Sequence, residues 1–409
     1  MSKVVIIGGG ASGMMAAIAA AENGNEVHVY EKNEKLGKKL FITGKGRCNI
    51  TNACDVETLL SNVVTNNKFL YSAFYAFDSY AMIDLLESCG LKTKIERGNR
   101  VFPKSDKSSD VIAVLHNRMK KLGVKIHLNS QVRDILIEGG CCKGIGLSKT
   151  DTIYADAVIV ATGGLSYETT GATGDGYNFA KKAGHTIAEL SPALVPFYTK
   201  ETEVKDLQGL SLRNIEATIY SGREVLYQEF GEMLFTHYGV SGPVLLSASS
   251  YAAKIIKKQH LTLSIDLKPA LSIEQLDARI VRDFEEAKNK QFKNVLSRLY
   301  PSKLIPVMIK RSTISPDKKI NEISKEERRK LVLATKNLTF TLIGLRDYKE
   351  AIITQGGVSI KGICPSTMES KNVKALYFVG EVLDLDAVTG GFNLQIAWST
   401  AYAAGKNIY

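Results

Sequence analysis

The first apolar segment of the sequence, 4–7, is a short uninterrupted hydrophobic run that stops at glycine. Such a run is typical of a strand buried on both faces of a parallel sheet. The small residues that follow the glycines predict a helix, and the segment 26–30 predicts a second short strand. The order of strand, glycines, helix and strand therefore predicts a βαβ unit at the start of the chain.

The glycines of this unit have the spacing of a dinucleotide-binding fingerprint, with Gly8, Gly10 and Gly13 in the G-x-G-x-x-G positions. The first allows a tight turn, the second lets backbone N–H groups approach a pyrophosphate, and the third lets the helix lie close to the sheet. Glu31 ends the second strand and is placed to accept a hydrogen bond from an unphosphorylated ribose. The alternative is a glycine-rich turn without a ligand.

A basic, glycine-rich segment follows at 36–52 and contains Thr-Gly-Lys-Gly-Arg-Cys-Asn at 43–49. Its core is too rich in glycine for a helix and too polar for a buried strand, so we expect a loop. The loop can bring Lys38, Lys45 and Arg47 towards phosphates or towards the negative charge of a reduced cofactor. The alternative is a basic surface turn.

A second nucleotide-binding signature appears at 155–164, where a buried strand opens into Ala-Thr-Gly-Gly. Between the two signatures we expect helices over 69–89 and 108–122, a strand at 124–128 that exits at the sheet edge, and a small antiparallel excursion over 135–154. The Ala-Thr-Gly-Gly turn, about 150 residues after the first fingerprint, favours FAD over NAD. No buried strand precedes the glycines of 171–176, so they do not predict a second dinucleotide site.

Two prolines in 191–196 indicate a domain boundary, and the pattern is β-like from there to about 265. Within it, a polar loop at 235–243 carries His237 and Tyr238 ahead of a helix at 244–253. Helical spacing and two capping boxes, which begin at Ser272 and Ser324, predict a helical segment over 271–335.

The last seventy residues return to the nucleotide-binding pattern. A buried strand ends in Gly380-Glu381, and the run from Gly390 to Gln395 opens a helix over 396–405. A strand-end acid can hold a ribityl hydroxyl, and a helix N-terminus can stabilise negative charge on a reduced flavin.

Composition limits the remaining possibilities. A chain of 409 residues with 44% hydrophobic residues is expected to form two or three globular domains. It contains no apolar run of membrane-spanning length and no signal-peptide layout, so we expect a cytoplasmic protein without a membrane partner. Its six cysteines lack metal-ligand spacing, so no metal site is expected. Cys141 and Cys142 are either a vicinal redox pair or simply two small residues beside a Gly-Gly turn.

The formal net charge of +11 is unevenly distributed. Residues 285–330 contain thirteen Lys or Arg and six Asp or Glu, which gives this segment a charge of +7. A surface of this kind suits a polyanion such as RNA. The alternative is a solvated helical surface.

Taken together, the motifs at 8–13, 31, 43–49, 161–164, 380–381 and 390–393 resemble those of the BaiN/YhiN-like family of bacterial FAD-dependent oxidoreductases. The resemblance covers nearly the whole chain. More broadly, the sequence is similar to glutathione-reductase-like FAD proteins and, at 161–176, to fumarate-reductase flavoproteins. The substrate arginines and histidines of fumarate reductases have no recognisable counterpart here, so that activity is not implied.

The expected fold class is α/β. It consists of a Rossmann-like FAD-binding domain of the glutathione-reductase type, split in sequence, with a β-rich insert and a small helical subdomain. We expect the FAD domain at 1–190 and 350–409, the insert at 191–270 and 336–349, and the basic helical subdomain at 271–335.

The resemblance also implies a reductase that transfers hydride from reduced FAD to an activated C=C bond, with NAD(P)H as a transient reductant. Two substrate classes are implied: a uridine of large-subunit rRNA reduced to dihydrouridine, and a small steroid-like or enone molecule. A non-catalytic FAD-stabilised binding factor is a third possibility. A C=C reduction also needs a proton donor, for which Cys48, His237 and Tyr238 are the candidates.

The resemblance further implies that Val132 meets the adenine and that the loop from Arg47 to Asn49 lies near the flavin. The expected cofactor-binding residues are Gly8, Gly10, Ala11, Ser12, Gly13, Glu31, Lys32, Lys38, Arg47, Asn49, Val132, Thr162, Gly163, Gly164, Gly380, Glu381, Gly391, Phe392, Asn393 and Leu394.

Overall fold

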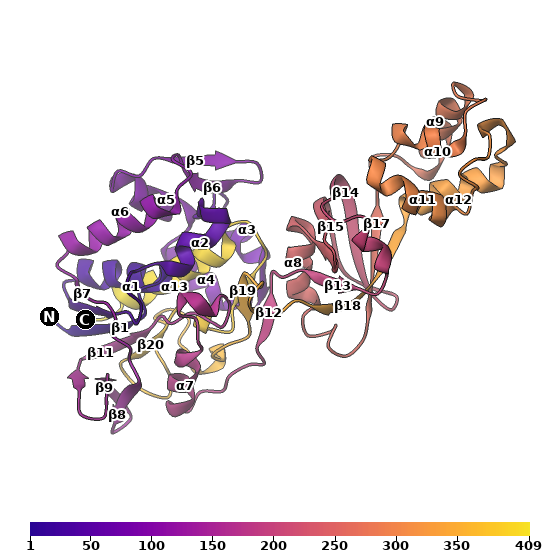
Figure 1. Ribbon diagram of the computed structural model, residues 1–409. Helices are drawn as coiled ribbons and strands as arrows, with labels where there is room; N and C mark the ends of the chain where they lie inside the picture. The colour runs from indigo at the N-terminus through magenta and orange to yellow at the C-terminus, as the bar shows by residue number, and fades with distance from the viewer. The chain divides into compact units, whose positions relative to one another are not determined.

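The computed structural model describes residues 1–409, which divide into two compact units (Figure 1). The first unit comprises Met1–Ala193 and Tyr348–Tyr409, and the second comprises Leu194–Asp347. Both the expected β-rich insert and the expected helical subdomain lie in the second unit.

A five-stranded parallel sheet forms the centre of the first unit. Its order is β20-β11-β1-β2-β7, so the N-terminal strand lies in the middle. The apolar run at the start of the chain is buried because it is the central strand of this sheet. The sheet confirms the Rossmann-like fold class. The strands are β1 (Lys3–Ile7), β2 (Glu26–Tyr30), β7 (Lys125–His127), β11 (Ala157–Val160) and β20 (Leu376–Phe378).

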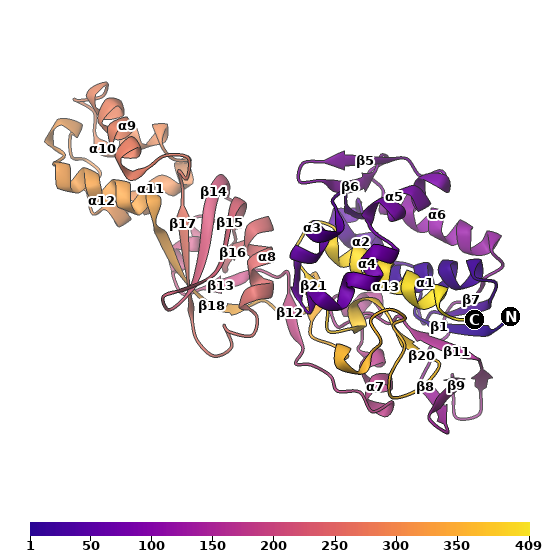
Figure 2. The same cartoon turned by 180° about the vertical axis from the view of Figure 1, so that it is seen from behind.

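The helix from the other end of the chain packs beside the first helix. α13 (Phe392–Lys406) contacts both α1 (Ala11–Glu22) and α4 (Tyr71–Ala76) (Figure 2). A Cβ atom at Gly405 would lie 2.7 Å from the Ala19 Cβ, so the close contact of α1 and α13 depends on glycine. The indole of Trp398 is fully buried and donates a 2.9 Å hydrogen bond to the Ile50 carbonyl.

Two helix predictions need correction. α13 begins at Phe392 instead of 396. Gly391, with φ +101°, makes the turn by itself, so the residues from Phe392 onward are helical. The predicted helix over 69–89 is divided into η1 (Asn67–Leu70), α4 and α5 (Ser79–Ser88), since Asp78 caps a new helix by accepting from the Ala81 N–H at 2.8 Å.

Smaller elements surround the central sheet. One antiparallel sheet is β10-β9-β8, a second is β3-β6-β5, and two pairs are β12-β19 and β4-β21. The bounds are α2 (Lys38–Gly46), β3 (Thr51–Asn52), α3 (Val56–Ser61), β4 (Val63–Thr65), β5 (Thr93–Glu96), β6 (Arg100–Pro103), α6 (Ser108–Lys121), β8 (Asp134–Glu138), β9 (Cys141–Gly146), β10 (Thr152–Tyr154), α7 (Asp175–Lys182), β12 (Ser191–Ala193), β19 (Ile353–Gln355), η8 (Gly380–Val382) and β21 (Asp386–Ala387). All six cysteines are free thiols.

The second unit contains a closed antiparallel barrel with the order β13-β16-β15-β14-β17-β18. Closure leaves no exposed strand edge. Phe197, Phe235 and Phe340 fill the interior, the last two in edge-to-face contact at 5.5 Å between ring centroids. The elements are β13 (Phe197–Thr199), β14 (Ser211–Ser221), β15 (Glu224–Phe235), β16 (Gly239–Ser241), α8 (Pro243–Ala252), β17 (Leu261–Asp266) and β18 (Leu338–Leu345).

Helices α9 (Ile273–Glu285), α10 (Phe292–Val295), α11 (Ile305–Ser312) and α12 (Lys325–Lys336) belong to the same unit. Both predicted capping boxes are present, at Ser272 and Ser324. The buried side chains of these helices are continuous with the barrel core. The expected helical subdomain is thus part of the same compact unit as the barrel.

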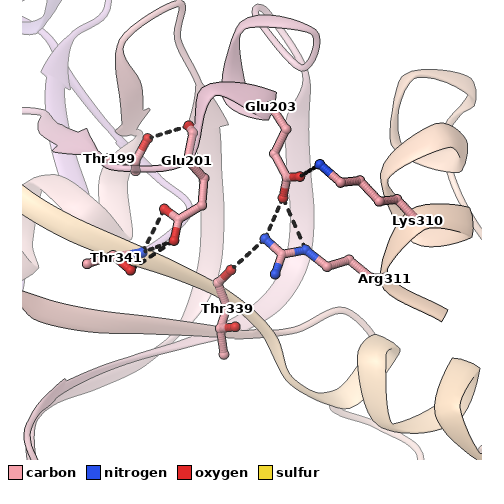
Figure 3. A network of polar contacts seen from close by, with 7 residues as sticks. All are labelled: Thr199, Glu201, Glu203, Lys310, Arg311, Thr339 and Thr341. Atoms are coloured by element: carbon pink, nitrogen blue, oxygen red, sulfur yellow. Dashed lines mark hydrogen bonds and ion pairs between the residues drawn. The ribbon is translucent and has the colours of Figure 1, made fainter. Parts of the chain in front are cut away.

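Polar contacts tie the helical part to the barrel (Figure 3). The Glu203 carboxylate accepts a 3.1 Å hydrogen bond from Arg311 Nε and a second from its Nη2, and lies 3.5 Å from Lys310 Nζ. Arg311 also donates to the Thr339 carbonyl of β18 at 3.2 Å. Nearby, Glu201 accepts from the Thr341 backbone N–H at 2.8 Å. Glu203 is the main ionic link, because its side chain is only 11% exposed.

We expect Glu203→Ala to lower the free energy of unfolding of the second unit by about 2 kcal/mol, because a charged hydrogen-bond pair is lost and a half-buried guanidinium is left without its carboxylate. Urea unfolding followed by circular dichroism would measure this. Fluorescence of Trp398, the single tryptophan, isolates the first unit's transition. Lys310→Ala is the control, since that side chain is 77% exposed. Equal losses in both variants would contradict the assignment.

Candidate cofactor and active site

A large cavity opens at the carboxyl ends of the central strands, entirely within the first unit. Its empty volume is about 1300 Å³, including the space open to solvent. Ile7, Tyr30 and Ala161, which end or directly follow β1, β2 and β11, line it. In open α/β sheets, ligands bind at this edge of the sheet.

The three fingerprint glycines differ in what surrounds them. A Cβ atom at Gly8 would lie 2.6 Å from the Ala161 carbonyl oxygen, and one at Gly13 would lie 1.9 Å from the Gly8 carbonyl oxygen. These two glycines are required by the protein's own packing. A Cβ atom at Gly10 would meet nothing within 4 Å, although Gly10 lines the cavity. The free space at Gly10 is therefore available to a ligand beside the N-terminus of α1.

Glu31 is a buried carboxylate at the end of β2, with 8% of its surface exposed. One oxygen accepts from the Gly9 N–H at 2.7 Å, and the other accepts from the Asn33 backbone and side-chain amides at 2.8 and 2.6 Å. Three donors hold the carboxylate in place without using all of its lone pairs. It can still accept from a ribose hydroxyl.

Three lysines around the cavity, Lys32, Lys38 and Lys39, have different partners. Lys32 Nζ pairs with Asp175 at 2.8 Å, and Lys38 Nζ donates to Asn33 Oδ1 at 3.2 Å. Lys39 Nζ contacts both oxygens of Glu381, at 2.9 and 2.6 Å. This last pair joins residues 342 positions apart, and both side chains line the cavity.

The C-terminal segment completes the cavity wall. Glu381 also accepts from the Thr354 N–H at 2.8 Å, which fixes the carboxylate at the end of β20. Asn393 in the first turn of α13 exchanges two hydrogen bonds with the Ala387 backbone, at 3.0 and 2.7 Å. The Thr162 hydroxyl, also in the cavity lining, is buried and has no hydrogen-bond partner within the protein. A bound ligand can supply the missing hydrogen-bond partner of this hydroxyl.

Most of the expected cofactor-binding residues line this cavity. Those that do are Gly8, Gly10, Ala11, Ser12, Glu31, Lys32, Lys38, Val132, Thr162, Gly163, Glu381, Asn393 and Leu394. The residues outside the lining are Gly13, Arg47, Asn49, Gly164, Gly380, Gly391 and Phe392. Gly164 and Gly380 serve packing, since Cβ atoms there would lie 2.5 Å from Thr354 Oγ1 and 2.7 Å from Ser12 Oγ.

Arg47 is held away from the cavity lining by a polar network. Its Nε donates to Asp106 at 2.7 Å, its Nη2 pairs with Glu96, and the guanidinium lies 4.1 Å from the centre of the Phe102 ring. The segment around it is a kinked turn, because Thr43 is extended while Gly44 and Lys45 have positive φ. Arg47 anchors this turn, and Thr43 from the same turn lines the cavity.

The three candidate proton donors lie in different surroundings. Cys48 is fully buried, and its burial raises the pKa of the thiol to about 12. His237 and Tyr238 are in the second unit, between β15 and β16, with His237 exposed and Tyr238 half-buried. The Arg346 guanidinium lies 4.4 Å from the centre of the Tyr238 ring. Burial disfavours Cys48 as the proton donor.

Several cavity residues were missed by the sequence interpretation. The segment Thr170, Gly171, Ala172 and Asp175 lines the same cavity as the N-terminal glycines, although its glycines do not form a second site. Asn33 and Lys39 were also missed. The signal for Lys39 was its place in the basic segment 36–52, but its partner Glu381 is remote in sequence.

These surroundings fit an adenine dinucleotide such as FAD. The backbone at Gly10 leaves room for phosphates where α1 begins, and helix N-termini favour anions. The buried Glu31 carboxylate suits a ribose hydroxyl, and the buried Thr162 hydroxyl has no hydrogen-bond partner within the protein. No group of three His, Cys, Asp or Glu residues is arranged to hold a metal ion. No helix is both long and apolar enough to cross a membrane.

Comparison with known proteins places the chain among flavoenzymes. A 3-dehydro-bile acid delta(4,6)-reductase of Clostridium scindens is 31% identical over 99% of this chain and 98% of that protein. A ribosomal RNA dihydrouridine synthase of Haemophilus influenzae is 33% identical over 100% and 98%. The 3-ketosteroid delta1-dehydrogenase structure from Sterolibacterium denitrificans shares the fold, with a TM-score of 0.51 and 12% identity over 99% and 98% of the two chains.

The family model described as HI0933-like protein Rossmann domain matches residues 2–407. This match spans both segments of the first unit and the whole second unit. The chain therefore belongs to the HI0933-like, or BaiN/YhiN-like, family of FAD-dependent oxidoreductases, as its motifs predict.

Proposed function

We propose that this enzyme reduces the C5=C6 bond of a uridine in large-subunit rRNA to dihydrouridine, with NAD(P)H as the source of electrons. The reaction adds one hydride and one proton to the double bond and converts NAD(P)H to NAD(P)⁺. The observation that carries the RNA assignment is the charge of +7 on residues 285–330, because a reductase of small molecules has no need of it. The similarity to a ribosomal RNA dihydrouridine synthase supports it.

The residues around the cavity would bind and orient FAD. Backbone N–H groups at Gly10 and the first turn of α1 hold the pyrophosphate, and Glu31 accepts from the ribose. Val132 would contact the adenine, and Glu381 and Asn393 would face the flavin. Bound FAD would supply the chemistry of hydride transfer between the nicotinamide and the double bond.

The second requirement is a proton at the other carbon of the double bond. Tyr238 is the best of the three candidates, since Cys48 is a buried thiol with a raised pKa. The Arg346 guanidinium lies 4.4 Å from the centre of the Tyr238 ring, which puts a cation beside this side chain. His237 packs edge-to-face on Tyr238 at 4.8 Å between ring centroids and is the second choice. An enzyme that acts on ribosomal RNA would work in the cytoplasm.

A second candidate is an NAD(P)H-dependent reductase of a small unsaturated molecule of steroid-like or enone type. The similarity to a bile acid delta(4,6)-reductase favours it, at nearly the same identity as the RNA enzyme. Because the two relatives are about equally similar to this chain, a direct test of both substrates is needed to distinguish the two candidate functions.

The deciding experiment is a single-turnover reaction without oxygen. The purified flavoprotein is reduced with NADPH or NADH and then mixed either with a transcript of large-subunit rRNA or with a steroid enone. We expect the transcript to restore the absorbance of oxidised flavin and to contain dihydrouridine when its nucleosides are analysed. Rapid reoxidation by the enone alone, with unchanged nucleosides, would establish the second candidate and reject the first.

A further inference from the structure

The thirteen basic residues of segment 285–330 fall into two classes in the structure. Six form ion pairs with carboxylates, in the pairs Lys293–Asp317, Arg298–Glu286, Lys310–Glu203, Arg311–Glu203, Lys318–Glu327 and Arg328–Asp277. Each of those cations already faces a carboxylate, like Arg311 in Figure 3. The other seven are exposed and have no ion pair, namely Lys288, Lys290, Lys303, Lys319, Lys325, Arg329 and Lys330.

Three of the exposed lysines are brought together by backbone pairing between two separate segments. Gln291 and Lys319 form an antiparallel bridge. The Ile320 N–H donates to the Lys290 carbonyl at 3.1 Å, and the Asn321 N–H donates to the Lys288 carbonyl at 3.2 Å. The pairing fixes Lys288, Lys290 and Lys319 as neighbours although up to 31 positions separate them in the sequence. We call these three residues the lysine cluster.

The surroundings of the lysine cluster hold its backbone in place and leave its side chains without ion-pair partners. Phe292, two residues after Lys290, and Ile320, directly after Lys319, are buried in the core of the second unit and anchor both segments. The carboxylates nearby are occupied, since Asp317 binds Lys293 and Glu327 binds Lys318. Three other carboxylates of the segment, Glu285, Glu322 and Glu326, are exposed and unpaired. Seven unpaired cations thus exceed three unpaired anions by four.

We infer that the lysine cluster is the RNA-contacting surface of this enzyme and that it binds the phosphate backbone. This inference rests on the proposed function. Lysines act on phosphate as point charges, and the neighbouring aromatic side chain, Phe292, is buried and cannot stack on a base. Phosphate contacts fix the position of a nucleic acid and do not read its sequence. The cluster therefore holds the RNA, and the choice of uridine belongs to other residues.

The test uses the full-length, FAD-loaded enzyme and a transcript of large-subunit rRNA, with binding measured between 50 and 200 mM salt. We expect Lys288→Gln/Lys290→Gln/Lys319→Gln to weaken binding at least tenfold and to reduce the slope of log K against log salt by about 2 to 3, because each phosphate contact contributes about 0.7 to 0.9. The flavin absorbance and the melting temperature should stay unchanged, since the three side chains are exposed.

The matched control is Lys293→Gln/Arg298→Gln/Lys318→Gln, which removes the same net charge from paired cations. We expect it to weaken RNA binding less than threefold. Equal losses in both triple variants, or wild-type binding by the cluster variant, would overturn the lysine cluster while leaving the proposed function intact. If the wild-type enzyme fails to bind the transcript at all, the RNA function and the cluster are both rejected.

Discussion

Gly10→Val should give a folded protein that purifies without flavin. A Cβ atom at Gly10 would meet no protein atom within 4 Å, so we expect the fold to tolerate valine, but the side chain would occupy the space beside the first turn of α1 that a pyrophosphate needs. We expect FAD affinity to fall at least 100-fold, because the backbone N–H groups can no longer approach the phosphates. Titration of the flavin-free protein with FAD, followed by quenching of flavin fluorescence, would measure the loss.

Gly13→Ala is the informative comparison, because its Cβ would lie 1.9 Å from the Gly8 carbonyl oxygen. This variant should lower the melting temperature of the flavin-free protein, whereas Gly10→Val should leave it unchanged. Normal FAD binding by Gly10→Val would show that the cavity at α1 does not hold the cofactor. A large fall in its melting temperature would show that Gly10 serves packing instead.

Tyr238→Phe should slow the reoxidation of reduced flavin by substrate about 10²- to 10⁴-fold, the usual contribution of a general acid. The phenylalanine keeps the ring packing against Tyr198 and Arg346 and removes only the hydroxyl. Reduction of the flavin by NAD(P)H should proceed at the normal rate, since this step needs no proton for the substrate carbon. Stopped-flow absorbance without oxygen separates the two half-reactions.

Two further variants make the proton-donor prediction specific. Cys48→Ala should leave both half-reactions nearly unchanged, because a buried thiol with a pKa of about 12 is a poor proton donor at neutral pH. His237→Gln tests the second choice. If Cys48→Ala were the variant that blocked substrate reduction, or if Tyr238→Phe slowed flavin reduction equally, Tyr238 would not be the proton donor.

The parts of the site that sequence could predict are local in the chain. The turn from β1 into α1 and the acid at the end of β2 depend on glycine spacing and strand length, which a short segment specifies. The two capping boxes were predictable for the same reason. The prediction that the C-terminal helix begins at 396 was wrong. Gly391 completes the turn by itself, so the helix begins directly after it, at Phe392.

The parts that sequence could not predict depend on remote partners. The residues near Arg47 in the sequence do not predict its partners Glu96 and Asp106, which hold its guanidinium away from the cavity lining. Lys39 similarly pairs with Glu381 near the other end of the sequence. The excess of positive charge in residues 285–330 could be counted from the sequence. Which lysines keep their charge available depended on carboxylates such as Glu203 and Asp277, outside the basic segment.

The split of the first unit has a consequence for the order of events during synthesis on the ribosome. The wall of the cavity includes Glu381 and Asn393, and both are translated only after the barrel and its helices are complete. Until then the sheet that carries the N-terminal fingerprint lacks β20, and α1 lacks its partner helix α13. We therefore expect a truncated or stalled chain, which lacks this part of the cavity wall, to retain its flavin poorly.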